Sequence, residues 1–506
     1  MDRYWRKVGL ADSKLWIKVH IDTDKMSHFS NSKVTTTIGD ILRYSNDRPL
    51  HVTMVVQNMD SLPPWLPDLC DTIQGTSHRW ASFSYQVVSG VAFESTVIPP
   101  LSLEPGLGSL EEIELRFGKY DGHTRHFNPC TLVDSISSAP NLCTVVIRDS
   151  FAPSSHFLSW PWAQITTLTL IGCHINDTAS FHDILQQARS LHTLDFDANM
   201  RREISPMTLP TVRRFGIGIG RYCDLFTVPR LEHLQVAIAI STNDRLISGI
   251  HRMVQRSNVS LKGITIREVN LGDVTVERFL RVVGSEVKEL IIEGMVFDHL
   301  FHCIASEPHD FLPNLEILKI RSEDPTRSSR GFLGWPNIPC ELSPPLEAVV
   351  SAARSEEKLK TLELELLRDP SESSCGISDD SAVRGQIEDL ERNGISVHIK
   401  HLDIPRELKG LALDRLGKLL ESTVGLFSNT ALGLHENMPV VDNLFRIVEK
   451  YIQEGRMSRE TVARTPMLRA AMTTYAYRNT GAPRDSEFNT RERAKVLMRR
   501  LNEIAR

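Results

Sequence analysis

Short segments with leucine or another apolar residue at alternate positions recur along the chain. Each contains the pattern L-x-x-L-x-φ, where φ is apolar, and most begin about 19 to 32 residues after the preceding one. An alternation with a period of two is typical of a β-strand that buries one face. We predict ten such strands, at residues 110–117, 142–149, 165–173, 191–198, 212–219, 231–238, 261–268, 287–294, 315–322 and 359–366.

Three further segments follow this rhythm less closely, at residues 48–56, 79–88 and 394–400. Between the strands, apolar residues three to four positions apart predict helices with one buried face. The clearest of these helices are residues 178–190, 244–257 and 276–285.

Strand, turn, helix and strand in repeated order indicate an α/β fold with a parallel sheet and helices outside it. One such unit cannot bury its own apolar face, so we expect the units to stack as an irregular leucine-rich-repeat solenoid. An ordinary doubly wound α/β domain is the alternative. It accounts less well for so many similar strands.

The strand pattern ends near residue 402, and the following segments have apolar residues at helical spacing instead. We expect them to form a small all-α helical bundle of roughly 100 residues. The predicted helices are about 406–427, 438–454, 458–464, 466–477 and 489–505.

Composition narrows the class of protein. The 506 residues carry a net charge of -5, and the basic excess is confined to the last part of the chain, so a nucleic-acid binder is not indicated. No apolar run is long enough for a membrane span, and the first 25 residues lack the apolar region of a signal peptide. The eight cysteines are scattered without a C-x-x-C pair. Free thiols are typical of the cytoplasm or nucleus.

Two segments resemble ligand sites at first sight. Residues 215–221, "FGIGIGR", contain alternating glycines, but a dinucleotide site needs them in the turn after a strand, so we expect these to lie along the strand itself. Residues 195–199, "DFDAN", lack the glycine and distal glutamate of a calcium loop. Metalloprotease, nucleophile-elbow and P-loop motifs are also missing from the sequence. We therefore expect a protein-binding surface, with no enzyme activity, cofactor or metal.

The first residues, "YWRKVGLADSKLW" (4–16), resemble the second half of an F-box, W-R-x-x-A-x-x-x-P-x-L-W. The segments "RPLHVTM" (48–54), "SHRWASF" (77–83) and "PWAQITTLTL" (161–170) are similar to the large F-box families of mushroom-forming fungi. This resemblance implies a substrate-recognition subunit of an SCF ubiquitin ligase. The residues that it places toward the Skp-type adaptor are Trp5, Leu10, Leu15 and Trp16.

The opening L-P-x-E part of the F-box does not precede these residues, so we expect the adaptor to bind weakly or not at all. The two tryptophans also have a purely structural interpretation, as amphipathic anchors that hold a helix against the first repeat.

The last part of the chain is similar to the helical N-terminal domain of transcription elongation factor S and to integrase-binding domains. The similar segments are "VDNLFRIVEKY" (441–451), residues 457–478 and "RERAKVLMRRLNEI" (491–504). The resemblance implies binding of short acidic disordered peptides, for which Arg469, Arg478, Arg499 and Arg500 are the candidates. A basic cap that packs on the open end of the solenoid is the alternative.

These observations predict three parts: an F-box remnant at residues 1–22, the repeats at 23–402 and the bundle at 403–506. We expect a non-catalytic receptor that holds a protein substrate on its repeat surface. The alternative is a nuclear scaffold whose bundle binds transcription or chromatin partners.

Overall fold

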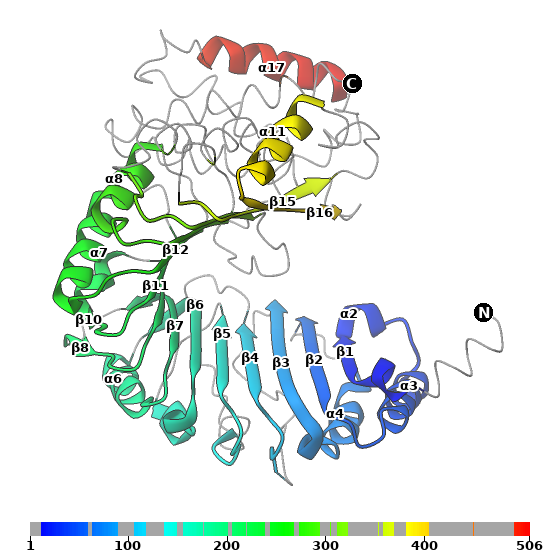
Figure 1. Cartoon of the computed structure of the whole chain (residues 1–506). Helices are drawn as coiled ribbons and strands as arrows, with labels where there is room; N and C mark the ends of the chain where they lie inside the picture. Colours follow the sequence, from blue (N-terminus) through cyan, green and yellow to red (C-terminus); the bar gives the residue numbers. More distant parts are fainter. Residues whose placement is uncertain are drawn as a thin grey trace. The chain divides into compact units, whose positions relative to one another are not determined.

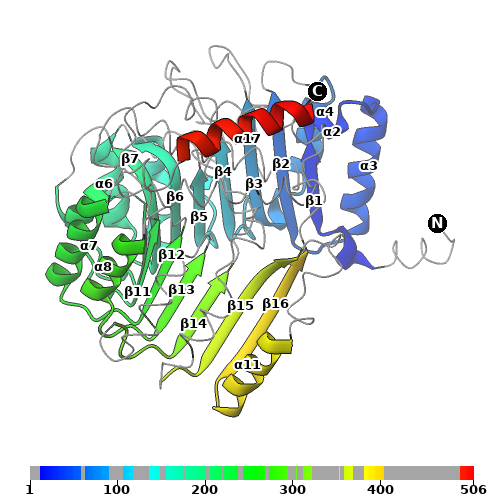
Figure 2. The same cartoon turned by 90° about the horizontal axis from the view of Figure 1, so that it is seen from above.

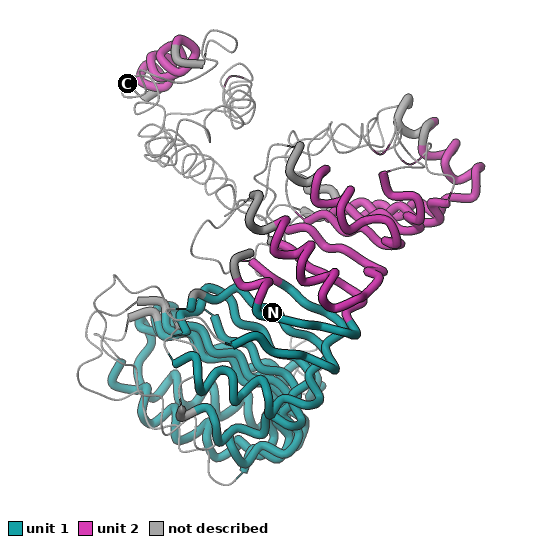
Figure 3. The backbone as a smooth tube through the Cα atoms, turned by 90° about the vertical axis from the view of Figure 1, so that its left-hand side faces the viewer, with its two compact units in different colours: residues 1–216, 225–230 teal, residues 217–224, 231–506 magenta. Residues whose placement is uncertain are grey.

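The computed structural model describes more than half of the chain, which is divided into two compact units (Figure 3). The first unit comprises residues 1–216 and 225–230, and the second comprises residues 217–224 and 231–506. The described residues are 12–58, 63–89, 106–117, 136–148, 155–175, 177–200, 205–218, 220–237, 243–267, 273–293, 304, 311–321, 353, 358–368, 381–403, 449 and 490–505.

Parallel strands form the first unit, and each strand pairs with the next one along the chain (Figure 1). Leu168 lies opposite Leu194, for example, and the register shifts only at Leu50/His51 in β2 and Ile171/Cys173 in β6 among the strand pairs described. The strands are β1 (Lys18–Asp22), β2 (Leu50–Asn58), β3 (Trp80–Ser89), β4 (Glu112–Phe117), β5 (Thr144–Arg148), β6 (Thr167–Ile175), β7 (Thr193–Met200) and β9 (Arg214–Ile217).

Helices connect several of these strands. The longer ones are α3 (Asn31–Tyr44), α4 (Leu66–Gln74) and α6 (Thr178–Gln187). The shorter elements are η1 (Ser13–Trp16), α2 (Thr23–Met26), η3 (Ser77–Arg79), η4 (Ser155–Ser159), η5 (Trp162–Gln164) and the two-residue parallel strands β8 (Met207–Thr208) and β10 (Phe226–Thr227). The short helix η6 (Gly220–Leu225) belongs to the second unit except for its last residue.

The core of the first unit lies between the sheet and these helices. Phe181 of α6 stacks on Phe196 of β7, with 5.7 Å between the ring centroids, which places α6 on the leucine face of the sheet. Along β3, Trp80, Phe83 and Tyr85 form a stacked series. Aromatic pairs of this kind add stabilisation beyond the apolar area that they bury.

The second unit repeats the same plan. Its strands β11 (His233–Ala237), β12 (Gly263–Arg267), β13 (Glu289–Glu293), β14 (Ile317–Arg321), β15 (Thr361–Arg368) and β16 (Ser396–Asp403) pair in parallel in sequence order. The helices α7 (Asn243–Ser257) and α8 (Asp273–Val283) lie on one face of this sheet (Figure 1, Figure 2). Helices α11 (Ser381–Arg392) and α17 (Thr490–Ala505) also belong to this unit.

The structure confirms the predicted mixed α/β class with a large parallel sheet. Each segment that was predicted from the alternating pattern contains a strand, which generally begins two residues after the first apolar residue of the motif. The second leucine of the motif points into the core, as five of the strands show. Leu168, Leu194, Leu234, Leu318 and Leu362 are all at most 1% exposed.

Other features differ from the sequence-based expectation. Strand β9 ends at Ile217, so Gly218 lies in a bend and Gly220 begins η6, which corrects the expectation that all three glycines lie along the strand. Of the five C-terminal helices, the last is confirmed as α17, and the others lie outside the described residues except for Glu449.

The residue directly before the first apolar residue of the motif is often polar. Its side chain donates a hydrogen bond to a backbone carbonyl at the start of the preceding repeat. Asn141 Nδ2 donates to the Gly108 carbonyl at 2.6 Å, and Asn314 Nδ2 donates to the Ser285 carbonyl at 2.8 Å. Each bond reaches the turn before the preceding strand and satisfies a carbonyl that secondary structure leaves unpaired. Three further bonds of this kind are Arg79 to the Arg48 carbonyl, Ser109 to the His78 carbonyl and Gln164 to the Leu142 carbonyl.

Candidate functional site

The strands of the second unit present a polar face opposite their leucine face. Successive side chains of a strand point to opposite sides of a sheet, so the residues between the buried leucines and isoleucines share this second face. On β13, for instance, Leu290 and Ile292 are buried while Glu289, Ile291 and Glu293 are partly exposed. The same alternation on β12, β14 and β15 makes this polar face continuous across neighbouring strands.

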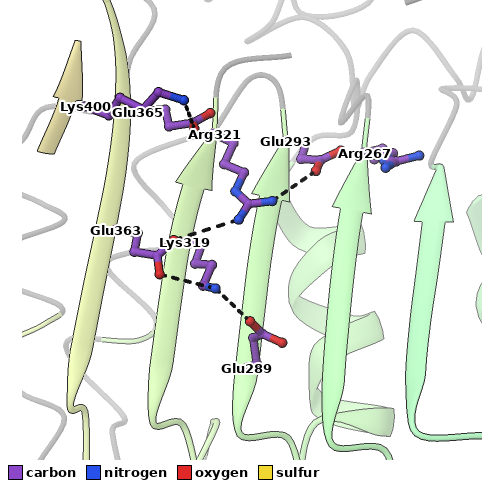
Figure 4. A network of polar contacts seen from close by, with 8 residues as sticks. All are labelled: Arg267, Glu289, Glu293, Lys319, Arg321, Glu363, Glu365 and Lys400. Carbon is purple, nitrogen blue, oxygen red and sulfur yellow. Dashed lines mark hydrogen bonds and ion pairs between the residues drawn. The ribbon is translucent and has the colours of Figure 1, made fainter. Parts of the chain in front are cut away.

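A chain of ion pairs crosses this face (Figure 4). Glu293 lies between Arg267 and Arg321, at 2.5 Å and 4.0 Å. Arg321 also approaches Glu363 at 3.8 Å. Lys319 then joins Glu363 to Glu289, with Nζ to oxygen distances of 3.3 Å and 3.1 Å.

Charges of opposite sign therefore alternate from strand to strand along this face. A separate pair, Lys400 with Glu365 at 3.2 Å, adds β16 to the same arrangement (Figure 4). Like charges directly opposite each other on neighbouring strands would destabilise the sheet, so the alternation stabilises the observed register. Most of these side chains are partly buried, with Lys319 17% and Arg321 35% exposed, which limits screening by solvent.

His233 places an imidazole ring on β11 next to this chain of charged groups. Its Nδ1 lies 3.9 Å from a carboxylate oxygen of Glu289, which is two strands away. The intervening strand carries Gly263 at this register position, between His233 and Glu289. A side chain there would collide with the His233 ring.

A second group of charges lies where the strands begin. Glu316 is held by two lysines, Lys288 at 2.8 Å and Lys360 at 2.6 Å. Hydrogen bonds from these two ammonium groups lower the pKa of Glu316 from 4.5 to about 2. Both lysines are well exposed, at 60% and 70%, so the accessible charge at this edge belongs to the lysines.

The polar face of the first unit has a different chemistry. Threonines in register, Thr144, Thr167 and Thr193, form a row across three neighbouring strands. Glu114 accepts a hydrogen bond from Ser84 at 3.1 Å and pairs with Arg148 at 2.8 Å. This face therefore combines hydroxyl groups with charged side chains, and the threonine row distinguishes it from the face of the second unit.

The described residues include no cluster of three or more histidine, cysteine or acidic side chains that could hold a metal ion. Burial raises the pKa of the Cys70 thiol to about 12 and raises the pKa of Cys223 as well, so neither is a thiolate nucleophile at neutral pH. Both faces can contribute hydrogen bonds and charge complementarity to a bound partner.

In the part of the chain that the structure describes, no helix is long and apolar enough to cross a membrane.

Two of the four N-terminal candidates lie within the described residues, and they have different surroundings. Trp5 and Leu10 lie outside the described residues. Leu15 is 64% exposed on η1, where it can contact another protein. Trp16 is half-buried and packs against the ring of Tyr44 on α3, at 5.4 Å between centroids, as the anchor interpretation expects.

The C-terminal candidates are divided in the same way. Arg469 and Arg478 lie outside the described residues, whereas Arg499 and Arg500 are exposed on α17. The opposite face of α17 is buried through Ala494, Leu497, Met498 and Leu501, which follow helical spacing.

Sequence reasoning identified the strands but not the charged network on their polar face. The sequence signal that could have revealed this network is the sign of the charge on the residues that alternate with the buried positions. Three neighbouring strands read "ELIIE", "ILKIR" and "TLELE", which are acidic, basic and acidic on the polar side. Comparison with known proteins adds nothing to these observations, because neither a protein-family model nor a curated protein matches the chain.

Proposed function

We propose that this chain is a non-catalytic protein-binding receptor that holds its partner on the polar face of the parallel sheet. The observation that carries this proposal is the ordered, alternating charge network from Arg267 to Glu289. Its members come from neighbouring strands about 4.8 Å apart, so they form a broad array that extends over several strands. Small molecules bind in concave, mostly apolar sites, whereas protein partners use broad surfaces of this kind.

Fixed charges on such a surface discriminate between partners. A partner with the complementary pattern replaces the solvent around these side chains, while a shifted or inverted pattern places like charges together. The proposed receptor would therefore select its partner mainly by charge register.

The more specific form of the proposal is an irregular leucine-rich-repeat receptor of the F-box type. The support for it is the recurring L-x-x-L-x-φ strand with its buried leucines, together with the F-box-like residues before β1. In this role the chain would hold a substrate for an SCF ubiquitin ligase, and the exposed Leu15 would face the adaptor. Coexpression with a Skp-type adaptor tests this form. We expect weak or no co-purification, and a stable complex would show that the residues before β1 suffice for docking.

The polar face itself is tested by adding bulk without removing any charge. Thr265 is half-buried on this face of β12, opposite Gln235 and Ile291, so Thr265→Tyr places a ring above the network. Thr37→Tyr, on the exposed side of α3, is the matched control. Affinity purification of each full-length variant with quantitative mass spectrometry should show partners lost only with Thr265→Tyr. Identical partner sets for both folded variants would rule out this face as the binding surface.

A second function has its own support in α17. Exposed Val496 lies one turn before Arg499 and Arg500, which gives an apolar residue beside two positive charges. This combination suits an acidic peptide with an apolar residue, as a scaffold for transcription or chromatin partners requires. Arg499→Glu with Arg500→Glu in the full chain should weaken binding of a labelled acidic-aromatic peptide, while Glu503→Lys should not.

A further inference from the structure

The last strand of the second unit, β16, has one edge that no other described strand covers. It pairs with β15 over eight register positions. The strands β11 to β14 have only five residues each. Edge strands in native proteins are usually short or otherwise protected, because their free N–H and C=O groups can pair with another chain.

Backbone direction identifies which groups face this edge. The Ser396 N–H donates to the Lys360 carbonyl on the β15 side. The N–H and C=O of one residue point to the same side of a strand and alternate with those of the next residue. The backbone groups of Val397 and Ile399 therefore point away from β15, toward the uncovered edge.

The side chains of β16 are incompletely covered in the same region. Val397 and Ile399 are only half-buried, although Leu362 and Leu364, their register partners on β15, are at most 2% exposed. One more strand with apolar residues at alternate positions would complete this layer of the core.

The charged residues of β15 and β16 indicate which side chain an additional strand should have on its polar side. The alternating series on the polar face ends with Glu365 on β15 and Lys400 on β16. The Lys400 side chain is 65% exposed. An acidic residue beside Lys400 continues the alternation, whereas a basic residue there would be repelled.

We propose that the edge of β16 binds an extended segment of a partner protein as an additional strand. The segment has apolar residues at alternate positions and an acidic residue next to Lys400. This edge is distinct from the polar face of the proposed function, so either site can fail its test without the other.

A second copy of the chain fits this edge less well. Its own first strand, β1, carries the apolar Val19 and Ile21, and Asp22 follows them. However, Asp22 is 5% exposed and accepts hydrogen bonds from the backbone N–H groups of Asp24 and Lys25, as the N-cap of α2. It is therefore committed within its own chain and cannot pair with Lys400.

The test uses a fluorescein-labelled peptide of about ten residues, the length of a long strand, with alternating valine and threonine and one central aspartate on the threonine side. Two control peptides carry lysine in place of the aspartate or N-methyl groups at alternate residues. Anisotropy titration with the full chain should show the aspartate peptide binding about fivefold more tightly than the lysine peptide, which corresponds to one favourable charge contact. Lys400→Glu should reverse this preference.

Ile399→Pro separates edge pairing from side-chain contact. Proline removes an N–H that faces outward, so pairing with β15 is retained, and an edge strand tolerates this substitution. Binding should weaken about fivefold with Ile399→Pro and remain unchanged with Ile399→Val, because only the first removes a backbone hydrogen bond.

Equal binding of the N-methylated peptide, or no binding by the folded chain, would overturn the proposal. A sedimentation coefficient that rises with the concentration of the chain, and no longer does so in Ile399→Pro, would also overturn the proposal. The strand bound at this edge would then come from a second copy of the chain.

Discussion

The imidazole ring of His233 fills the space that a side chain at Gly263 would need. The two residues are direct register partners on β11 and β12. Because glycine has no Cβ, the ring reaches across a whole strand and brings Nδ1 to 3.9 Å from Glu289 on β13. Glycine at position 263 therefore allows a side chain of β11 to approach the charge network on β13.

The first prediction concerns this pair. Gly263→Ala alone should change the free energy of unfolding by less than about 1 kcal/mol, because His233 can rotate away while alanine favours the extended backbone. In a His233→Ala background, the same substitution should stabilise the chain by about 0.5–1 kcal/mol. Urea unfolding of the four proteins in a double-mutant cycle measures the coupling. Strict additivity would show that the ring and position 263 do not compete for space.

A second glycine should respond very differently. A Cβ at Gly284, just after α8, would collide with the Leu280 carbonyl and the Leu312 side chain, and a backbone carbonyl cannot rotate away. Gly284→Ala should therefore destabilise the chain by about 1–3 kcal/mol. Gly385→Ala is the matched control, since Gly385 lies within α11 with open space around it and should gain about 1 kcal/mol. Thermal unfolding followed by circular dichroism should move the two variants in opposite directions.

The third prediction tests the leucine face. Leu168 is fully buried on β6, so Leu168→Ala should cost about 2–5 kcal/mol through lost apolar burial and the cavity left behind. Leu15→Ala removes the same atoms from a side chain that is 64% exposed, and its effect should stay within about 0.5 kcal/mol. Similar losses in the two variants, measured by urea unfolding, would contradict the assignment of the core.

The fourth prediction concerns pH. Lys288 and Lys360 lower the pKa of Glu316 from 4.5 to about 2 in the folded chain. A lowered pKa means that the folded state binds this proton less readily than the unfolded state, so the contribution is present above pH 4.5 and is lost as the pH falls toward 2. Stability should consequently fall less steeply over this window in Glu316→Gln than in the wild type.

Salt provides the control for this pH effect. Both lysines are exposed, so added salt should reduce the difference between wild type and Glu316→Gln by screening the pairs. Parallel pH profiles at low salt would indicate that the two lysines do not hold the carboxylate in solution.

The sequence by itself determined most of the residues that form the sheet and which of them are buried, although β1 (Lys18–Asp22) was not among the predicted strands. Leucine at alternate positions leaves one way for a strand to hide its apolar side, so the pattern alone assigns Leu194 and Leu362 to the core, where both lie. The exposed Arg499 and Arg500 likewise follow from the apolar spacing on the other side of α17.

The tertiary structure decided which polar residues meet. Lys319 and Glu289 are 30 positions apart in the sequence, and they form a pair only because β13 and β14 lie side by side in a particular register. The contact between Gly263 and the His233 ring depends on strand neighbours in the same way. So does the uncovered edge of β16. Burial is a property of one strand, which its own hydrophobic pattern specifies, whereas an ion pair between strands depends on the connecting segments that set their order and register.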